Sequence, residues 1–400
     1  MQLLSNKLND VNISATARIH NLLLQKKYLG EKIINLSVGE PDFNTPKNVQ
    51  EAAHDAISKG KTRYTATDGS IELKEAIIDK FKKENSLSYQ KSEIIVCSGG
   101  KQVIFNALLA TLDKEDEVVV PSPYWVSYPD IVKLCGAKVA FIQTKLENSF
   151  KITPRQLEKA LNAKTKWLVL NSPSNPTGSV YTKEELTRLA EIIERFPNVN
   201  IVSDDIYEHI IYQDLPFYNI VQVNPSLKHR TLLVNGVSKS YAMTGWRIGF
   251  GAANSSLVKG MITIQSQSTS NPCSISQCAA VEALKNTNQF IQQNKIIYQT
   301  RRDIMINIFS KSKYIEVSNP MGAFYALPSI QKLIGKVSSA GKKIENDSDF
   351  VFELLNETGV AVVPGSAFGM KNTFRISYAI SDTLLEEACH IIVKFANNLV

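Results

Sequence analysis

Lys239 is the side chain whose surroundings most clearly indicate chemistry. It lies in the segment NGVSKSYAMTGWRIGFG (235–251), between two serines, just after a run of apolar residues, with Arg247 eight positions later. A partly desolvated lysine near a fixed cation has a lowered pKa, which an imine-forming amine requires. A plain surface lysine is the alternative interpretation of the same position. The segment therefore offers a candidate nucleophilic amine that needs further support.

A second candidate site is the turn Gly99-Gly100-Lys101. It follows an apolar run and precedes a helical pattern, so its bare backbone amides would lie at a helix N-terminus, where anions bind. A glycine pair is also a common structural solution for a tight turn. The chain contains no P-loop pattern and no dinucleotide-binding glycine pattern after a strand, so neither kind of nucleotide site is predicted.

The elements that would position these residues alternate along the middle of the chain. Short runs rich in Val and Ile predict strands at 94–97, 117–120, 138–142, 167–170, 200–202, 231–234 and 248–251. Helical patterns lie between them, and the capping box of Thr182 and Glu185 predicts a helix over 183–196. This order predicts an α/β fold with a mostly parallel sheet and right-handed crossovers.

The two ends of the chain have a different pattern. A long helical pattern from about 274 to 310 is followed by expected strands at 314–317, 323–327, 361–363 and 373–378, with one helix near 349–357. These elements predict a second, α+β domain. A helix expected over 15–28 would pack with this C-terminal part or reach a partner chain.

Composition narrows the class of protein. The 400 residues suffice for two or three domains, and 44% hydrophobic with 21% charged residues is typical of a folded chain. A net charge of +7 without a basic tract argues against nucleic-acid binding, and no apolar stretch is long enough for a membrane span. Five cysteines without C-x-x-C spacing predict a reducing, cytoplasmic location and no zinc site, and the five histidines match no metal spacing.

The segment Ser238-Lys-Ser-Tyr-Ala-Met-Thr-Gly-Trp-Arg247 closely resembles the lysine signature of class I aminotransferases, which are pyridoxal-phosphate enzymes of fold type I. Other segments resemble the motifs of this family in the same order: VGEPDF (38–43), SPYW (122–125), NSPSNPTG (171–178), SDDIYE (203–208) and FRISY (374–378). The resemblance covers nearly the whole chain and is nearest to the bacterial branch of aspartate and aspartate/prephenate aminotransferases. It implies a large, mostly parallel sheet domain plus a smaller α+β domain.

The resemblance also implies pyridoxal 5'-phosphate as cofactor and assigns residues to it. Lys239 would form the imine, Asp204 would face the ring nitrogen, and Trp125 would stack on the ring. The remaining cofactor contacts would come from Tyr207 and Asn175 at the phenolic oxygen, from Gly99, Gly100, Lys101, Ser238 and Arg247 at the phosphate, and from Tyr64 of the neighbouring subunit. Asp205 is expected to be a cap or a solvent-facing acid.

Substrate contacts follow from charge as well as from the resemblance. Arg375 lies in an alternating strand, where an inward arginine is costly unless it meets an anion such as a substrate α-carboxylate. Gly39 would let the backbone approach that carboxylate, with Trp125 and Asn175 nearby. Lys101 and Thr16 match the positions that meet the distal carboxylate in the aspartate branch.

These observations predict a homodimeric aspartate aminotransferase that uses 2-oxoglutarate. Prephenate or broader dicarboxylic and aromatic substrates are an alternative, which Asn12 weakens because prephenate-using relatives have a lysine four positions before the threonine. A fold type I lyase is a second alternative. The expected domains are an N-terminal arm with part of the small domain (1–45), a large cofactor domain (46–290) and a small C-terminal domain (291–400).

Overall fold

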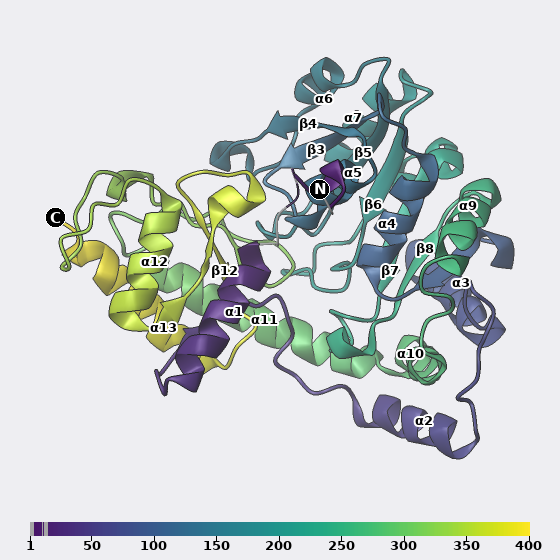
Figure 1. Ribbon diagram of the computed structural model, residues 1–400, viewed down its shortest axis with the longest axis horizontal. Coiled ribbons are helices and arrows are strands. Elements are labelled where there is room, and N and C mark those ends of the chain that lie inside the picture. The colour runs from purple at the N-terminus through teal and green to yellow at the C-terminus, as the bar shows by residue number, and fades with distance from the viewer. Residues whose placement is uncertain (1–3, 10, 12–14) are drawn as a thin grey trace.

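The computed structural model describes residues 4–9, 11 and 15–400, and a seven-stranded sheet forms the centre of its larger part (Figure 1). The strand order is β2-β8-β7-β6-β5-β3-β4. Strands β7, β6, β5, β3 and β4 are parallel, whereas β8 is antiparallel to both β7 and β2. The bounds are β2 (Ile94–Cys97), β3 (Glu117–Ser122), β4 (Lys138–Gln143), β5 (Thr165–Asn171), β6 (Asn200–Asp204), β7 (Thr231–Gly236) and β8 (Gly249–Ala252). The predicted strands and the mostly parallel sheet are confirmed.

Helices cover both faces of this sheet, which explains why its strands are almost continuously apolar. Alternate residues of β5 and β6, such as Trp167, Val169 and Val202, pack in one cluster with one group of helices, and Leu168 and Ile201 pack in another. The first group is α4 (Gly100–Thr111), α5 (Ser127–Leu134) and α9 (Ser255–Ser266). The second is α2 (Lys47–Ser58), α3 (Ile71–Asn85), α6 (Pro154–Ala160), α7 (Lys183–Glu194), α8 (Ile220–Val223) and α10 (Ser274–Asn286).

The smaller part contains two short sheets with helices around them. Strands β11 (Val363–Pro364), β12 (Phe374–Ser377) and β9 (Tyr325–Ala326) are antiparallel, and β1 (Ile34–Asn35) pairs in parallel with β10 (Val360–Ala361). Helices α11 (Asn288–Phe309), α12 (Asp347–Thr358) and α13 (Asp382–Asn398) complete a separate apolar core. The predicted α+β character is therefore confirmed.

Two details differ from the sequence-based expectation. The helical pattern of 274–310 forms two helices, because Thr287 leaves the helical conformation with φ −124° and ψ 18° between α10 and α11. The strand expected at 314–317 is wrong: the segment makes one isolated bridge, between Glu316 and Ser329. Single-bridge pairing leaves most of its backbone outside any sheet.

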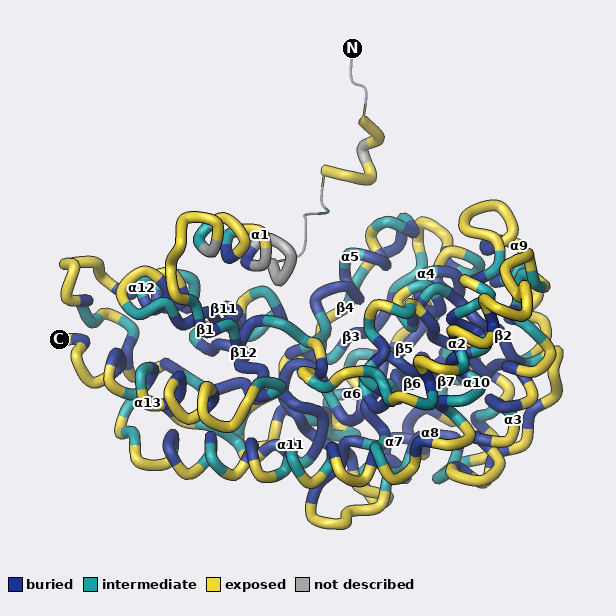
Figure 2. Tube along the Cα trace, turned by 90° about the horizontal axis from the view of Figure 1, so that it is seen from below, coloured by how far each residue is buried: buried dark blue, intermediate teal, exposed yellow. Residues whose placement is uncertain are grey.

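The N-terminal helix α1 (Ala15–Tyr28) lies against the smaller part, with its outer side exposed (Figure 2). Ile19 and Leu23 pack there with Leu355, Val363 and Phe368. This confirms the expected packing with the C-terminal part. Helix α11 extends from the smaller part towards the sheet (Figure 1).

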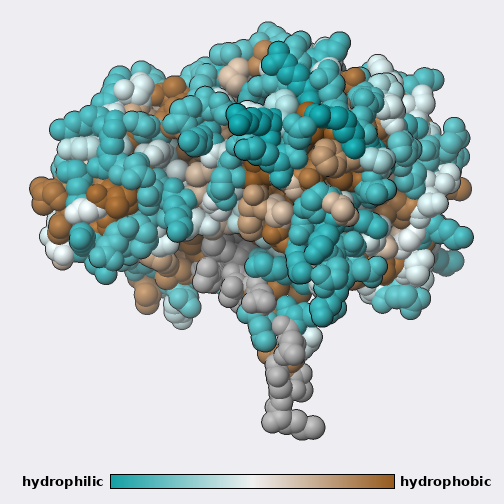
Figure 3. Space-filling model, turned by 90° about the horizontal axis from the view of Figure 1, so that it is seen from above, coloured by the Kyte–Doolittle hydropathy of each residue, from teal (hydrophilic) through white to brown (hydrophobic). Residues whose placement is uncertain are grey.

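The remaining regular elements of the described chain are short 3-10 helices, at Asn6–Leu8, Lys91–Glu93, Leu146–Asn148, Pro225–Arg230, Thr244–Trp246, Gln331–Leu333 and Gly365–Phe368. In the view of Figure 3 the surface is mostly hydrophilic, with hydrophobic residues in separate patches. None of the helices in the described ranges is long and apolar enough to cross a membrane.

Candidate active site

A cavity of about 410 Å³ lies at the carboxyl ends of the parallel strands, where α/β sheets bind ligands. Strand β6 ends there in Asp204, β5 ends in Asn171, and the loop after β7 brings Lys239. Residues of the smaller part close the other side. The lining is Ser37, Val38, Gly39, Gly100, Lys101, Trp125, Tyr128, Asn171, Asn175, Asp204, Ile206, Tyr207, Ser238, Lys239, Thr244, Arg247, Tyr325 and Arg375.

Lys239 is half-buried at this cavity, and its Nζ donates a hydrogen bond of 2.7 Å to the carbonyl oxygen of Gly39. Desolvation lowers the pKa of Lys239 to about 8, and the cations of Arg375 and Arg247 act in the same direction, against the nearby Glu40. A larger fraction of this amine than of an ordinary lysine is therefore neutral near pH 7. This is the state that a nucleophilic or proton-abstracting lysine needs.

Asp204 is buried at the end of β6, and its Oδ2 accepts a hydrogen bond of 2.6 Å from the hydroxyl of Tyr128. Burial raises the pKa of Asp204 to about 6, while the Tyr128 hydrogen bond opposes the rise. The side chain of Asn171 donates to the backbone carbonyl of Asp204 at 2.8 Å and so holds the strand end. A buried carboxylate held in this way suits a cationic ring nitrogen.

The neighbouring Asp205 differs from expectation. It is only 3% exposed, and its carboxyl accepts a hydrogen bond of 2.7 Å from the Ser203 hydroxyl. Burial raises the pKa of Asp205 well above its ordinary value. The prediction of a cap or solvent-facing acid is wrong because both faces of this strand end are covered.

Arg375 reaches the cavity from β12 in the smaller part. It is buried, donates to Asn175 Oδ1 at 3.2 Å and to the Ser37 carbonyl, and packs over the ring of Tyr325. Its Nε is buried without a hydrogen-bond partner. A buried donor without a partner points to an anion that the cavity is built to receive.

Tyr207 and Tyr325 form a hydroxyl pair at 2.9 Å beside this arginine. Both residues are buried, and burial raises the pKa of each phenol. Gly39 lies directly against the Tyr325 hydroxyl, since a Cβ at position 39 would collide with it. The residue type at 39 therefore decides how closely backbone and phenol approach.

The other end of the cavity has the features of an anion site. Gly99 has φ +91°, Gly100 begins α4, and a Cβ on Gly99 would lie 2.5 Å from Nη2 of Arg247. Arg247 donates to the carbonyls of Thr244 at 2.9 Å and Ser98 at 3.3 Å, and Ser238 lines the same cavity. Helix-end amides, a guanidinium and a hydroxyl together suit a phosphate group.

Lys101 and Trp125 lie near each other at the cavity, with Lys101 Nζ 5.0 Å from the centre of the indole. Partial desolvation, together with the Arg247 cation, lowers the pKa of Lys101. Trp125 packs edge-on against Tyr128 at 5.3 Å. In the described part of the chain, Lys101, Arg247 and Arg375 form no ion pair with any carboxylate, so three cationic side chains face the cavity unpaired.

The structure does not bring one predicted site residue, Tyr64, to this cavity. Tyr64 is 92% exposed and does not line it. Thr16 lies at the start of α1, and its side chain, like Asn12, is outside the described residues. Conversely, sequence reasoning missed Tyr128 and Tyr325. Tyr128 stands three residues after Trp125, so its place at the beginning of a helix beside the aromatic motif was the available signal.

Comparisons with known proteins show the family to which the chain belongs. A family model described as aminotransferase class I and II matches residues 31–392. The probable aspartate/prephenate aminotransferase of Rickettsia felis is 50% identical over 97% of this chain and 95% of its own. The aspartate/prephenate aminotransferase of Cereibacter sphaeroides is 49% identical over 100% of both chains.

Solved structures of aspartate aminotransferases are similar to this chain in fold. The aspartate aminotransferase from Rhizobium meliloti superposes with a TM-score of 0.96 at 44% identity, covering 100% of both chains. The Thermus thermophilus aspartate aminotransferase with maleate has a TM-score of 0.92 at 38% identity, covering 99% of this chain and 100% of its own.

Proposed function

Because the chain belongs to the class I and II aminotransferase family, we propose that it transfers the amino group of L-aspartate to 2-oxoglutarate, forming oxaloacetate and L-glutamate. The observation that supports this proposal best is the set of three unpaired cationic side chains, Lys101, Arg247 and Arg375, around one cavity that contains Lys239. A cofactor phosphate and the two carboxylates of a dicarboxylic substrate would satisfy these three charges.

We propose pyridoxal 5'-phosphate as the cofactor, and the cavity fits it. The space left by Gly99 beside Arg247, at the N-terminus of α4, suits the phosphate, with Gly100, the Lys101 amide and Ser238 adding donors. When bound, this cofactor supplies an electron sink for the bonds at the substrate α-carbon.

The other roles belong to the chain's own side chains. Lys239 would link to the cofactor and, once released as a free amine, move the proton at the substrate α-carbon, for which a lowered pKa is suitable. Asp204 would keep the ring nitrogen protonated. Tyr207 and Asn175 would donate to the phenolic oxygen, and Trp125 would stack on the ring.

For the substrate, Arg375 would bind the α-carboxylate through its guanidinium, helped by the close approach of backbone at Gly39. Lys101 would bind the distal carboxylate, together with Thr16. The similar Thermus thermophilus aspartate aminotransferase was solved with maleate, a dicarboxylate, which supports this substrate class. Asn175, which already contacts Arg375, would hold the guanidinium in place.

A second candidate substrate is prephenate, also a dicarboxylate. It is supported by the names of the relatives from Rickettsia felis and Cereibacter sphaeroides. Asn12 is the reason to rank it second, because the resemblance implies a lysine at this position in relatives that use prephenate.

We further propose a homodimer in which Tyr64 of each copy reaches the cofactor phosphate of the other. Its 92% exposure in the single chain supports this proposal. The domain bounds at 45/46 and 290/291 are proposed with it, in keeping with the two separate apolar cores. The cytoplasmic location stays a prediction.

A panel of amino donors with 2-oxoglutarate, and of keto acids with glutamate, tests the substrate. We expect aspartate to be the preferred donor, with Lys101→Ala raising its KM and leaving monocarboxylic donors unaffected. Unchanged aspartate KM in Lys101→Ala would remove the argument for the distal carboxylate. Release of ammonia or CO₂ without a keto acid would instead favour a lyase.

A further inference from the structure

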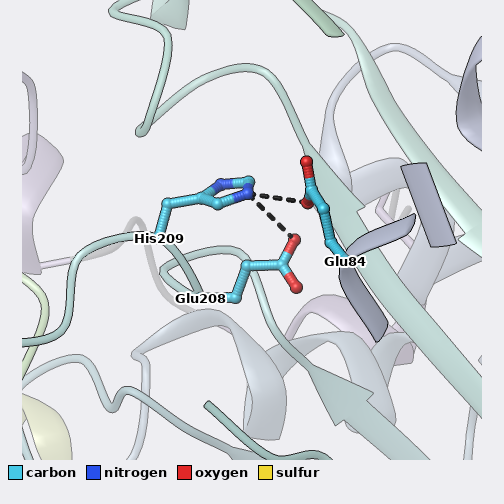
Figure 4. A group of neighbouring side chains, drawn as sticks. All are labelled: Glu84, Glu208 and His209. Carbon is cyan, nitrogen blue, oxygen red and sulfur yellow. Dashed lines mark hydrogen bonds and ion pairs between the residues drawn. The ribbon is translucent and has the colours of Figure 1, made fainter. Parts of the chain in front are cut away.

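A polar network with a buried centre lies next to the segment that carries Asp204 and Tyr207. It joins Lys80, Glu84 and Asn85 of α3 to Glu208 and His209, which follow Tyr207. Figure 4 shows the ring of His209 pointing towards the carboxylates of Glu84 and Glu208. None of these side chains lines the cavity that contains Lys239.

Glu208 is the centre of this network. Its side chain is 3% exposed, and its two oxygens accept hydrogen bonds from Asn235 Nδ2 at 2.6 Å and Asn85 Nδ2 at 3.0 Å. The ammonium of Lys80, whose side chain is 1% exposed, is in direct contact with the same carboxylate. Both oxygens and the charge of Glu208 are therefore satisfied within the protein.

The group drawn in Figure 4 has the residue types of a metal site, with the ligand atoms of Glu84, Glu208 and His209 within 4.8 Å of one another. A cation is already present, however. Lys80 Nζ contacts Glu208 and lies 3.4 Å from Glu84, so a divalent ion here would meet a buried like charge. The lysine therefore takes the place that a metal ion would occupy.

The network connects two segments that carry residues of the candidate active site. Glu208 directly follows Tyr207 and comes four residues after Asp204, whereas its partner Asn235 comes four residues before Lys239. The hydrogen bond between Glu208 and Asn235 thus joins the turn after β6 to the end of β7, from which the lysine loop begins. Lys80 and Asn85 fix this junction to α3.

We propose that Glu208 is a positioning residue that fixes Tyr207 and Asp204 relative to Lys239. The proposal rests on the proposed function, since it concerns the geometry of the same cofactor site. Three donors, Lys80, Asn85 and Asn235, converge on Glu208, and only a carboxylate accepts from all of them without presenting a donor of its own. In a glutamine at position 208, the NH₂ group would face one of these donors. The repulsion would displace the turn after β6 from its partner residues.

The test compares Glu208→Gln with the matched control Glu84→Gln in the cofactor-loaded protein. Glu84 belongs to the same network, but its side chain is 38% exposed, and the amides of Asn235 and Asn85 donate to Glu208 rather than to its carboxylate. The first readout is the pH midpoint of the visible absorption of the lysine-linked cofactor. A weakened Tyr207 contact at the phenolic oxygen is expected to raise this midpoint by about one pH unit, since one neutral hydrogen bond contributes about 1 kcal/mol.

Steady-state kinetics give the second readout. In Glu208→Gln, kcat for aspartate is expected to fall at least about tenfold. KM should stay within twofold, because Arg375 and Lys101 do not touch the network. Glu84→Gln should match the wild type in midpoint and kcat.

The wild type and Glu208→Gln together distinguish failure of the proposed function from failure of the positioning role. If the wild type forms no lysine-linked cofactor band, the proposed function fails. If the wild type forms it and Glu208→Gln keeps the wild-type midpoint and kcat, the positioning role is refuted. Should Glu208→Gln not fold, Lys80→Met/Glu208→Gln also removes the ammonium that has lost its buried carboxylate partner, and the same shifts are expected from it.

Metal content provides an independent check. A stoichiometric divalent metal in the purified protein that is lost in Glu84→Gln would overturn the assignment of Lys80 as the cation of the network.

Discussion

Replacing Tyr128 with phenylalanine removes the hydroxyl that donates to Asp204 at 2.6 Å and leaves the ring in place. Asp204 is buried, and burial already raises its pKa to about 6 from an ordinary value of 3.8. The Tyr128 hydrogen bond lowers that pKa because it favours the carboxylate. Its loss therefore raises the pKa of Asp204 further.

The size of the change follows from the charge on the acceptor. A hydrogen bond to a charged group contributes about 1.5–3 kcal/mol, and one pKa unit corresponds to about 1.4 kcal/mol, so the expected rise is about one to two units. The ionised form of Asp204 is lost as pH falls through its pKa. In Tyr128→Phe this loss should begin one to two pH units higher, at about pH 7 to 8 in the free protein.

Cofactor affinity reports this titration, because only the ionised carboxylate pairs with a protonated ring nitrogen. We expect the dissociation constant of the cofactor, measured between pH 5 and 9, to increase as the pH falls. In Tyr128→Phe this increase should begin at a higher pH than in the wild type. Tyr124→Phe is the matched control, because the Tyr124 ring stacks on Phe141 at 5.1 Å and does not line the cavity. If the Tyr128→Phe profile overlays that of the wild type, Tyr128 does not tune Asp204.

Two other substitutions test the charged ends of the cavity. Arg375→Lys keeps the charge but loses the fork of donors, so KM for aspartate should rise about 10- to 100-fold in steady-state kinetics; a KM within twofold of the wild type would refute carboxylate binding there. Gly99→Ala places a Cβ 2.5 Å from Nη2 of Arg247 at φ +91°, so the cofactor dissociation constant should rise at least about tenfold. Gly245→Ala, where a Cβ meets nothing within 4 Å, should leave it unchanged, and equal affinities in both variants would contradict a phosphate site at Gly99.

The strands of the large sheet and most residues of the cavity could be predicted from the sequence, because local patterns indicate both. The Val- and Ile-rich runs predicted the strands of the large sheet, because strands covered on both faces leave few polar positions. The motifs around Lys239, Asp204 and Arg375 predicted residues that the fold brings to one cavity, although they belong to distant segments.

The missed features depend on contacts that no local pattern records. Tyr128 meets Asp204 across 76 positions, and Tyr207 meets Tyr325 across 118, so each partner is visible only once the chain is folded. The prediction for Asp205 is wrong for the same reason, since the covering of its strand end comes from other elements. The strand prediction at 314–317 is wrong because a suitable composition does not supply a partner strand, and pairing stops at the single bridge between Glu316 and Ser329.

The proposed function depends on Lys239 as the amine that links to pyridoxal 5'-phosphate. Borohydride reduction of the cofactor-loaded protein, followed by peptide mass spectrometry, tests it directly. We expect one pyridoxyl-modified residue, Lys239, and no modification or visible band in Lys239→Ala. Modification of another lysine, such as Lys101, or an unchanged visible band in Lys239→Ala, would contradict it.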